Sequence, residues 1–224
     1  MTFNFLRSGI VAAAILAMPF TAQAADLPAP SYKAPAYVSP SFSWSGFYIG
    51  VNAGYGFGNS HWEVPVVDLS PRGGLFGGTI GYNYQTGTWV WGLEGDIAYS
   101  SIKGSSTCGA ATCETANSWL GTARGRLGYA GWTNFLPYIT GGAAFGNIKA
   151  THSVFGSANQ TKVGYTIGLG VEYALFSNWS IKAEYLFADL GKFNCGASCG
   201  GPAVTNDNVS FKANIIRAGL NYRF

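Results

Sequence analysis

The sequence is poor in charge. Asp, Glu, Lys and Arg make up only 10% of its 224 residues, whereas a typical soluble domain has about 25%. The formal net charge is +3, and the basic residues are scattered along the chain. This pattern lacks the basic patch of a nucleic-acid-binding protein, so we expect no nucleic-acid partner. Aromatic residues, by contrast, reach 16%, and glycine occurs 32 times, which is an unusual composition for a soluble domain.

Long apolar runs are absent after the first 20 residues. Residues 10–20 are apolar, Arg7 precedes them and Ala22-Gln23-Ala24 follows, as in a secretory leader with its small-residue cleavage site. We expect residues 1–24 to be a signal peptide. A transmembrane helix needs about 20 apolar residues, so a mature chain that crosses a bilayer must cross it as strands. Its sheet must close, because unpaired edge amides are costly in hydrocarbon.

Residues 25–43 are rich in proline, with Pro28, Pro30, Pro35 and Pro40, and they lack hydrophobic periodicity. Such a composition predicts a flexible segment of polyproline character rather than a domain. We expect this segment to lie in the periplasm, ahead of a single domain over residues 44–224.

The remaining sequence alternates between apolar residues and polar or small ones. Its carboxyl-terminal stretch places Ile216, Leu220 and Phe224 on one side and Arg217 and Asn221 on the other. One apolar and one polar face predict a strand between lipid and a polar interior. Eight such stretches predict an all-β fold, an eight-stranded antiparallel transmembrane β-barrel. The expected strands are residues 44–57, 75–84, 89–100, 117–129, 136–148, 162–175, 179–188 and 209–224.

Two of these strands have an ambiguous alternation. In the fifth, Ile139 competes with Tyr138 for the lipid-facing side. In the last, the alternation changes parity near Ile215 and Ile216, which predicts a bulge.

Short and long connections alternate along the chain. The short turns are residues 85–88, 131–134 and 176–178, and the long loops are residues 58–74, 102–116, 149–161 and 189–208. Outer-membrane barrels have short periplasmic turns and long extracellular loops, so this order predicts two periplasmic termini. Across the first short turn, we expect Tyr84 to pair with Trp89 and Tyr82 with Trp91.

Charged residues within the strands face the interior in this scheme. The predicted lumen residues are Glu94, Asp96, Arg124, Arg126, Glu172, Lys182, Glu184 and Arg217. Across the third short turn, Glu172 falls opposite Lys182. Because an eight-stranded barrel is just wide enough for side chains to fill, we expect ion pairs to plug the lumen. A small porin that passes solutes is the alternative.

A hairpin centred near Ala110 predicts further pairs in the lumen. This centre places Asp96 opposite Arg124 and Glu94 opposite Arg126. The result is an expected ladder of salt bridges between neighbouring strands.

The four cysteines lie in two of the long loops, as Cys108 and Cys113 and as Cys195 and Cys199. Their spacing, without a nearby histidine, is poor for a metal site. An oxidising compartment favours disulfides. Of the three possible connectivities we expect the two local ones, because Cys108 and Cys113 straddle the expected hairpin centre.

Candidate catalytic residues are few. His61 and His152 are the only histidines, with Ser60, Ser70 and Ser153 near them in sequence. A nucleophile needs a base that a third group holds in place, and the sequence shows no such arrangement. We expect no enzyme activity, no catalytic residue and no cofactor.

Four blocks of sequence together resemble a known family. They read Trp-Ser-Gly-Phe-Tyr-Ile-Gly at residues 44–50, Gly-Tyr-Gly at 54–56, Gly-Thr-Ala-Arg-Gly-Arg-Leu-Gly-Tyr at 121–129 and Tyr-Arg-Phe at 222–224. The combination is similar to the RopB-type small outer-membrane proteins of Gram-negative bacteria, which are related to the OmpA transmembrane domain and the opacity proteins. The resemblance covers about residues 44–224.

The resemblance implies an integral protein of the outer membrane that supports envelope integrity and acts as a surface antigen. It also implies insertion guided by an aromatic carboxyl-terminal strand, with Tyr222 and Phe224 as the assembly signal. The expected partners are outer-membrane lipid and lipopolysaccharide, periplasmic chaperones and the barrel-assembly machinery, and host or environmental ligands at the loops.

A surface receptor or adhesin is a further alternative, since some members of the family are described as haem binders. Residues of the long loops that suit such a role are His61, Trp62, Glu63 and Lys103. Solvated loop tips are the simpler interpretation of the same residues.

Overall fold

The computed structural model describes residues 42–63, 66–196 and 208–224. The predicted signal peptide, most of the proline-rich segment and Cys199 lie outside these residues. The described strands are β1 (Gly46–Trp62), β2 (Val67–Leu69), β3 (Arg72–Thr86), β4 (Trp89–Cys108), β5 (Ala111–Tyr129), β6 (Phe135–His152), β7 (Gly156–Phe176), β8 (Trp179–Asn194) and β9 (Asn208–Arg223). No helix among the described residues is long and apolar enough to cross a membrane.

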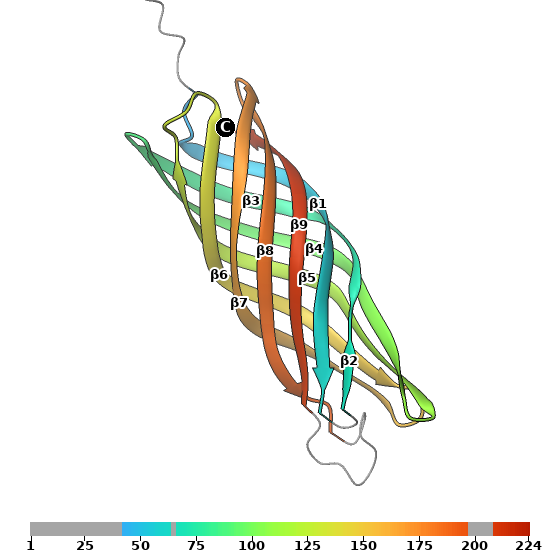
Figure 1. The fold of residues 1–224 in the computed structure, drawn as a ribbon. Helices are drawn as coiled ribbons and strands as arrows, with labels where there is room; N and C mark the ends of the chain where they lie inside the picture. The colour runs from blue at the N-terminus through green and yellow to red at the C-terminus, as the bar shows by residue number, and fades with distance from the viewer. Residues whose placement is uncertain (1–41, 64–65, 197–207) are drawn as a thin grey trace, which may run out of the picture. The chain divides into compact units, whose positions relative to one another are not determined.

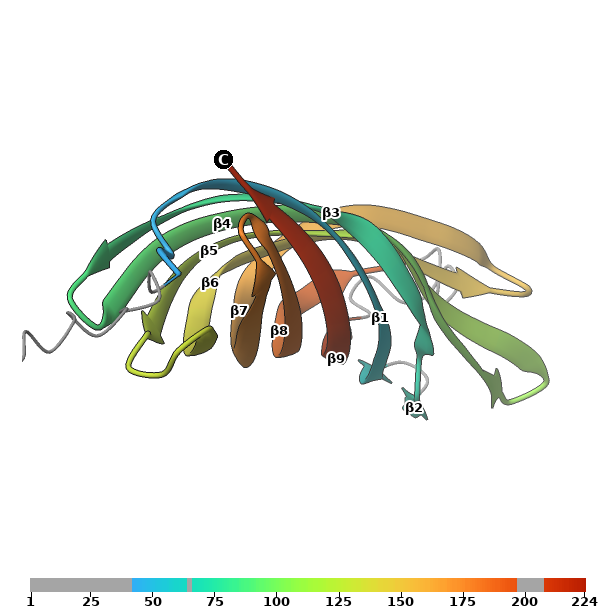
Figure 2. The ribbon, with the colours of Figure 1, turned by 90° about the horizontal axis from the view of Figure 1, so that it is seen from above.

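One antiparallel sheet contains these strands and closes on itself (Figure 1). Strands β3 to β9 pair in chain order, and β1 pairs with both β3 and β9. Figure 2 shows β9 beside β1, where the ring closes. The three residues of β2 continue β3 in the same register against β1. The two are interrupted only at Ser70 and Pro71, because proline has no N–H for the ladder. The closed ring therefore has eight strands, which confirms the predicted fold class.

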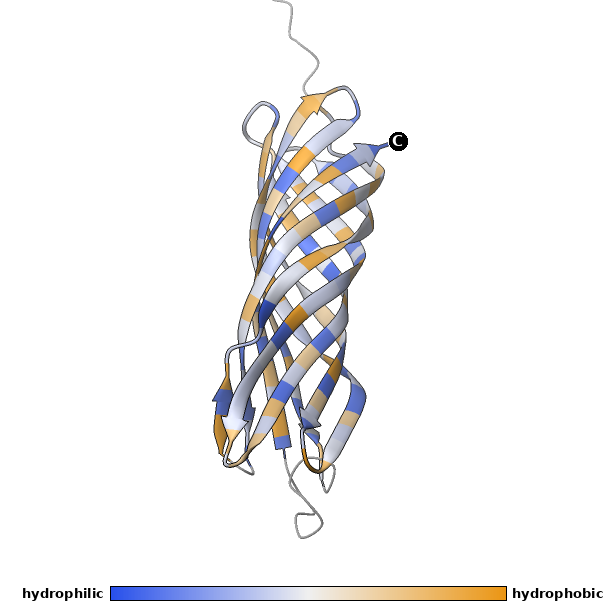
Figure 3. Cartoon of the chain, turned by 90° about the vertical axis from the view of Figure 1, so that its right-hand side faces the viewer, coloured by the Kyte–Doolittle hydropathy of each residue, from blue (hydrophilic) through white to orange (hydrophobic). Residues whose placement is uncertain are grey.

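The outer surface of the ring is apolar along much of its length. Large side chains that a soluble protein would bury are exposed, among them Leu93 at 73%, Tyr99 at 70% and Phe47 at 64%. Apolar and polar positions follow one another along the strands in Figure 3, as period two requires. In β6, whose alternation is ambiguous in the sequence, Ile139 points outward and is 62% exposed, whereas Tyr138 points inward and is 4% exposed. An exposed apolar surface of this extent indicates contact with a membrane.

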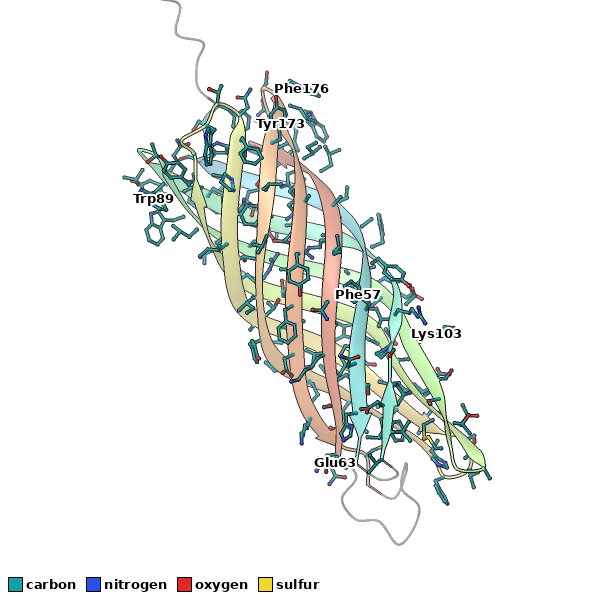
Figure 4. The ribbon with its side chains drawn as sticks, in the orientation of Figure 1. Phe57, Glu63, Trp89, Lys103, Tyr173 and Phe176 are labelled. Atoms are coloured by element: carbon teal, nitrogen blue, oxygen red, sulfur yellow. A yellow bond between two sulfur atoms is a disulfide. The ribbon has the colours of Figure 1, made fainter. Side chains whose placement is uncertain are left out.

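Aromatic side chains gather at the end of the barrel that carries the short turns. The rings of Trp89 and Tyr129 have centroids 5.4 Å apart, and those of Tyr222 and Phe224 have centroids 5.2 Å apart. Figure 4 shows Trp89 at this end. Such aromatic belts lie at the membrane–water interface, so the last residues of β9 belong to a belt.

The strands are longer than the sequence predicts. Strands β4 and β5 extend to a two-residue turn at Gly109 and Ala110, where Gly109 has a φ of +65°. Residues 102–116 therefore form a hairpin, and the loop predicted there is wrong. Strands β6 and β7 likewise run through most of the loop predicted at residues 149–161.

A change of polarity inside the barrel explains this difference. In the long hairpins most of the large inward side chains are apolar, whereas nearer the middle of the barrel many are charged. Strand β9 shows the change, because Phe211, Ala213, Ile215 and Arg217 are all buried and the register against β1 is unbroken. The predicted bulge near Ile215 is therefore wrong, since the alternation continues while the chemistry of the interior changes.

The first short turn is tighter than expected. Only two residues separate β3 from β4, and Gly87 among them has a φ of +60°. As a result Tyr84 pairs with Trp91 rather than Trp89. The predicted register is wrong by two residues, but outward residues still face outward residues.

Candidate functional site: an ion network that fills the lumen

All eight predicted lumen residues point into the barrel. They are the carboxylates Glu94, Asp96, Glu172 and Glu184 and the cations Arg124, Arg126, Lys182 and Arg217, each at most 9% exposed. We call this set the lumen network. Its charges of opposite sign are equal in number, and a buried charge is tolerated only when it is paired and hydrogen-bonded.

Arg124 lies at the centre of the lumen network. Its Nη2 donates to Glu94 and, at 3.0 Å, to Asp96 Oδ2, and its Nη1 donates to Glu184 Oε1 at 2.8 Å. Its Nε donates to the Thr122 hydroxyl at 2.8 Å. Because Glu184 is on β8, which is not a neighbour of β5 in the sheet, this guanidinium spans the lumen.

Arg217 makes a second crossing, from β9 to β4. Its Nη1 and Nη2 donate to the two oxygens of Asp96 at 3.0 Å each, and its Nε donates to Glu184 Oε2 at 2.7 Å. Such bidentate pairs are strong and fix geometry. Lys182 Nζ donates to Glu94 Oε2 at 2.8 Å, from β8 to β4. Strands on different sides of the ring are thus joined through its centre.

Arg126 and Glu172 form the part of the lumen network nearer the short turns. Arg126 Nη2 donates to Glu172 Oε2 at 2.7 Å, and the guanidinium stacks over the Tyr138 ring, 4.0 Å from its centroid. Ser180 and Asn221 donate to the other Glu172 oxygen at 2.5 and 3.1 Å. Both oxygens of this buried carboxylate therefore have partners, as buried polar groups require.

The predicted ladder between β4 and β5 is wrong in its register. Glu94 lies directly opposite Arg124, not Arg126. The hairpin centre lies half a residue earlier than expected, and the register shifts again between Tyr99 and Ile102. The charged residues still face the interior, but their partners are different.

The pair across the third short turn shows that two residues facing each other on neighbouring strands need not form an ion pair. Glu172 lies opposite Lys182, in the register that the sequence predicts. The Lys182 ammonium nevertheless hydrogen-bonds to Glu94 on the far side of the lumen. In a narrow barrel, a long inward side chain meets several strands.

An apolar layer fills the lumen on the long-hairpin side of the lumen network. Its members include Trp62, Leu69, Ile102, Leu186 and Phe211, each no more than 2% exposed. Sequence reasoning missed this layer because it assigned Trp62, Leu69 and Ile102 to loops and did not expect an apolar interior in the strands that contain Leu186 and Phe211. The sequence did contain evidence of this layer. The alternation continues along the same strands, but toward the long hairpins the large apolar residues take the inward positions.

A second apolar cluster closes the short-turn end. It consists of Trp44, Val90, Leu136 and Ala174. Arg223 lies against it, with its guanidinium 4.7 Å from the ring centroid of Phe42 and 4.9 Å from that of Trp44. Its Nη1 donates to the Ser43 carbonyl at 2.8 Å. Sequence reasoning also missed Arg223, although its inward parity in the carboxyl-terminal strand pointed to it.

Cys108 and Cys113 form a disulfide between β4 and β5, with Cα atoms 5.8 Å apart. Both belong to the apolar layer. Cys195 is also disulfide-bonded. Its pairing with Cys199 stays a prediction, because Cys199 lies outside the described residues.

The two histidines have different surroundings. His61 Nδ1 lies 2.7 Å from Asp68 Oδ1 near the surface. His152 is buried, accepts a hydrogen bond from the Val154 N–H at Nδ1 and stacks on Phe155. Over residues 42–63, 66–196 and 208–224, neither imidazole hydrogen-bonds a serine hydroxyl. In the same ranges, no group of three or more His, Cys, Asp or Glu residues is placed to hold a metal ion.

Known proteins share this sequence pattern. The chain matches the family described as outer membrane protein beta-barrel domain over residues 10–224. It is 38% identical to the 31 kDa outer-membrane immunogenic protein of Brucella melitensis biotype 1 over 210 residues, which cover 82% of this chain and 85% of that protein. It is 33% identical to the 25 kDa outer-membrane immunogenic protein of Brucella abortus biovar 1, over 96% of each chain.

A relative from another genus gives a similar result. The 22 kDa outer membrane protein of Rhizobium leguminosarum bv. viciae is 35% identical over 184 residues, which cover 81% of this chain and 79% of that protein. Among solved structures, Neisserial surface protein A aligns with a TM-score of 0.49 and 16% identity, over 80% of this chain and 98% of that one. Since the family match spans every described strand, the chain is an integral outer-membrane protein that belongs to the outer membrane protein beta-barrel domain family.

Proposed function

We propose that this protein is a structural, surface-exposed barrel of the outer membrane whose lumen is closed by its own side chains. The observation that carries the proposal is the pair of crossings made by Arg124 and Arg217, which join opposite parts of the ring through the lumen. Apolar layers lie on both sides of these charges. A hydrated ion entering from either end would have to leave water and displace fixed, paired charges, both of which are costly.

The long hairpins face the cell exterior in this proposal, and the short turns face the periplasm. Barrels of the outer membrane have this asymmetry. The names of the Brucella relatives describe them as immunogenic, which supports a role for these hairpins as surface antigens. Envelope integrity is the second part of the role, and neither a catalytic residue nor a cofactor takes part in it.

The carboxyl-terminal strand guides assembly in this proposal. Tyr222 lies near the end of β9 and Phe224 directly follows this strand, with its ring against that of Tyr222. Periplasmic chaperones and the barrel-assembly machinery reach these aromatic residues before the ring closes. Exposure of these apolar side chains to water is unfavourable, so assembly ends with their burial in lipid.

Planar bilayer recordings on the refolded protein test closure of the lumen. We expect no steady conductance, while a general porin in the same bilayers serves as the positive control. A steady, uniform conductance from the wild-type barrel would refute the closed lumen and favour a small porin.

Haemin titration separates the structural role from a haem receptor. We expect intact cells that carry the wild-type protein and cells that carry a His61→Ala, His152→Ala double variant to bind haemin equally. The reason is that the buried His152 stacks on Phe155, away from an incoming porphyrin, while His61 is an exposed side chain near the surface and a single exposed imidazole holds haem weakly. A clear loss of haemin binding in the double variant would instead support the receptor.

A further inference from the structure

The lipid-facing surface ends at about the same level on four adjacent strands, β9, β1, β3 and β4. Toward the long hairpins, the last large apolar or aromatic residues on their outer faces are Ile216, Phe57, Phe76 and Tyr99. Beyond them come Asn214, Asn59, Arg72 and Lys103. Because the apolar band of an outer-membrane barrel ends where the lipid headgroups begin, these polar residues lie at headgroup level.

Arg72 and Lys103 are direct partners across β3 and β4. Both are exposed, and the Cβ atoms of such partners are about 5 Å apart, a separation at which like charges repel. On its other side, Arg72 pairs with Phe57 of β1. Figure 4 shows Phe57 and Lys103 on the same side of the barrel. Two positive charges therefore lie next to an aromatic ring that borders the lipid.

Neither of these two cations has an ion-pair partner in the part of the chain that the structure describes. Two other cations near the long hairpins are paired, since Lys192 Nζ lies 2.9 Å from Glu63 Oε1 and Lys212 Nζ lies 3.5 Å from Asp189 Oδ2. Two facing cations without a counter-charge are unfavourable within the protein alone. An anion from the surroundings would remove this repulsion.

A hollow of about 480 Å³ opens beside Arg72. It lies where Pro71 interrupts the wall of the barrel, and its lining includes Asn59 and Asn214. The Tyr185 hydroxyl donates to Asn214 Oδ1 at 2.6 Å, which leaves the amide NH₂ of Asn214 as a donor. The hollow thus combines a guanidinium and amide donors with space for a ligand group.

We propose that Arg72, Lys103 and this hollow bind a phosphate group of lipopolysaccharide in the outer leaflet. A phosphate supplies the missing negative charge and several acceptor oxygens for the guanidinium. The acyl chains of the same molecule would cover Phe57 and Phe76 on the apolar wall next to the site. A free phosphate would neutralise only the two cations, whereas a phosphorylated lipid would also cover the apolar wall beside them. The site rests on the proposed orientation, with the long hairpins at the cell exterior, but not on whether the lumen conducts.

Titration of the refolded full chain in detergent micelles tests the proposal. The probes are bisphosphorylated lipid A, the same lipid after enzymatic removal of its phosphates, and inorganic phosphate. Arg72→Gln with Lys103→Gln removes the site, and Lys149→Gln with Lys192→Gln removes the same charge elsewhere near the long hairpins. An interfacial cation strengthens binding to anionic lipid about fivefold, so we expect the site variant to bind lipid A about 25-fold more weakly.

The control variant should bind lipid A with an affinity within a few fold of that of the wild type. The dephosphorylated lipid should bind the wild type as weakly as lipid A binds the site variant. Equal losses in the site and control variants would overturn the site. Inorganic phosphate that displaces lipid A at equal concentration would overturn the assignment to a lipid headgroup. Heat-modifiable migration checks that each variant is folded. If the double variant fails to fold, Lys103→Gln alone is tested, with an expected loss of about fivefold.

Discussion

Removal of Arg124 gives the most direct test of the lumen network. Arg124→Met keeps much of the apolar stem but deletes the charge. The three carboxylates that Arg124 contacts then keep Lys182 and Arg217 as hydrogen-bonded cations, with Arg126 at 3.8 Å from Glu94. Removing one partner of a buried ion pair costs about 3–5 kcal/mol, because the other charge stays buried without compensation. Arg124 bonds three carboxylates rather than one, so we expect the free energy of unfolding to fall by about 5 kcal/mol, at the upper end of that range.

Three further variants, Glu184→Gln, its combination with Arg124→Met, and Lys212→Gln, turn this expectation into a test of the network itself. Glu184→Gln added to Arg124→Met restores equal numbers of positive and negative charges. We expect the double variant to be more stable than the sum of the two single changes by about 1–3 kcal/mol. Lys212→Gln is the control for an exposed pair, since it removes only the contact with Asp189, and we expect a cost below about 1 kcal/mol.

Urea titration of the barrel in lipid vesicles, followed by tryptophan fluorescence, measures the free energy of unfolding of the wild type, of Arg124→Met, Glu184→Gln and their combination, and of Lys212→Gln. The reasoning would be refuted if Arg124→Met cost no more than Lys212→Gln, or if the effects of Arg124→Met and Glu184→Gln simply added. Either result would mean that the ions are solvated by water in the lumen rather than by one another.

Three other predictions concern the two ends of the barrel. The hydrogen bond from Lys192 holds the pKa of Glu63 below its usual range, so this contact between β8 and the end of β1 persists in mild acid and is lost as the pH falls through that lowered pKa. Proteolysis of the long-hairpin end should therefore rise only below that pKa, and Glu63→Gln should abolish the pH dependence; an unchanged profile in the variant would contradict this. Replacing Cys108 and Cys113 by Ala should lower the free energy of unfolding by no more than about 2 kcal/mol, because the closed loop is short, and hydrogen exchange should rise only at the tip of the β4–β5 hairpin. Deletion of Phe224 should reduce the amount of folded, heat-modifiable barrel in outer-membrane fractions, and a normal amount would show that assembly does not need it.

The sequence alone determined which side chains of the barrel meet lipid. Phe47, Leu93 and Ile216 are outward because period-two alternation fixes the face of every residue in a strand once one face is known. The same local rule placed Arg124 and Arg217 inside. The positions of turns, such as the one at Gly87, were also predictable from the sequence. The exact length of each turn, and therefore the register of the strands that it joins, was not, because an alternating pattern locates the ends of a strand only to within a few residues.

Only the tertiary structure decided which of the inward groups meet. Arg124 and Glu184 are 60 positions apart and on strands that are not neighbours, so their contact depends on how tightly the ring curves and closes. The apolar layer around Trp62 and Phe211 is a second example. Its strands alternate like the others, but they extend beyond the lipid. Whether the polar or the apolar face of a strand turns outward depends on the solvent around it, and that is set by how far the closed ring stands out of the membrane.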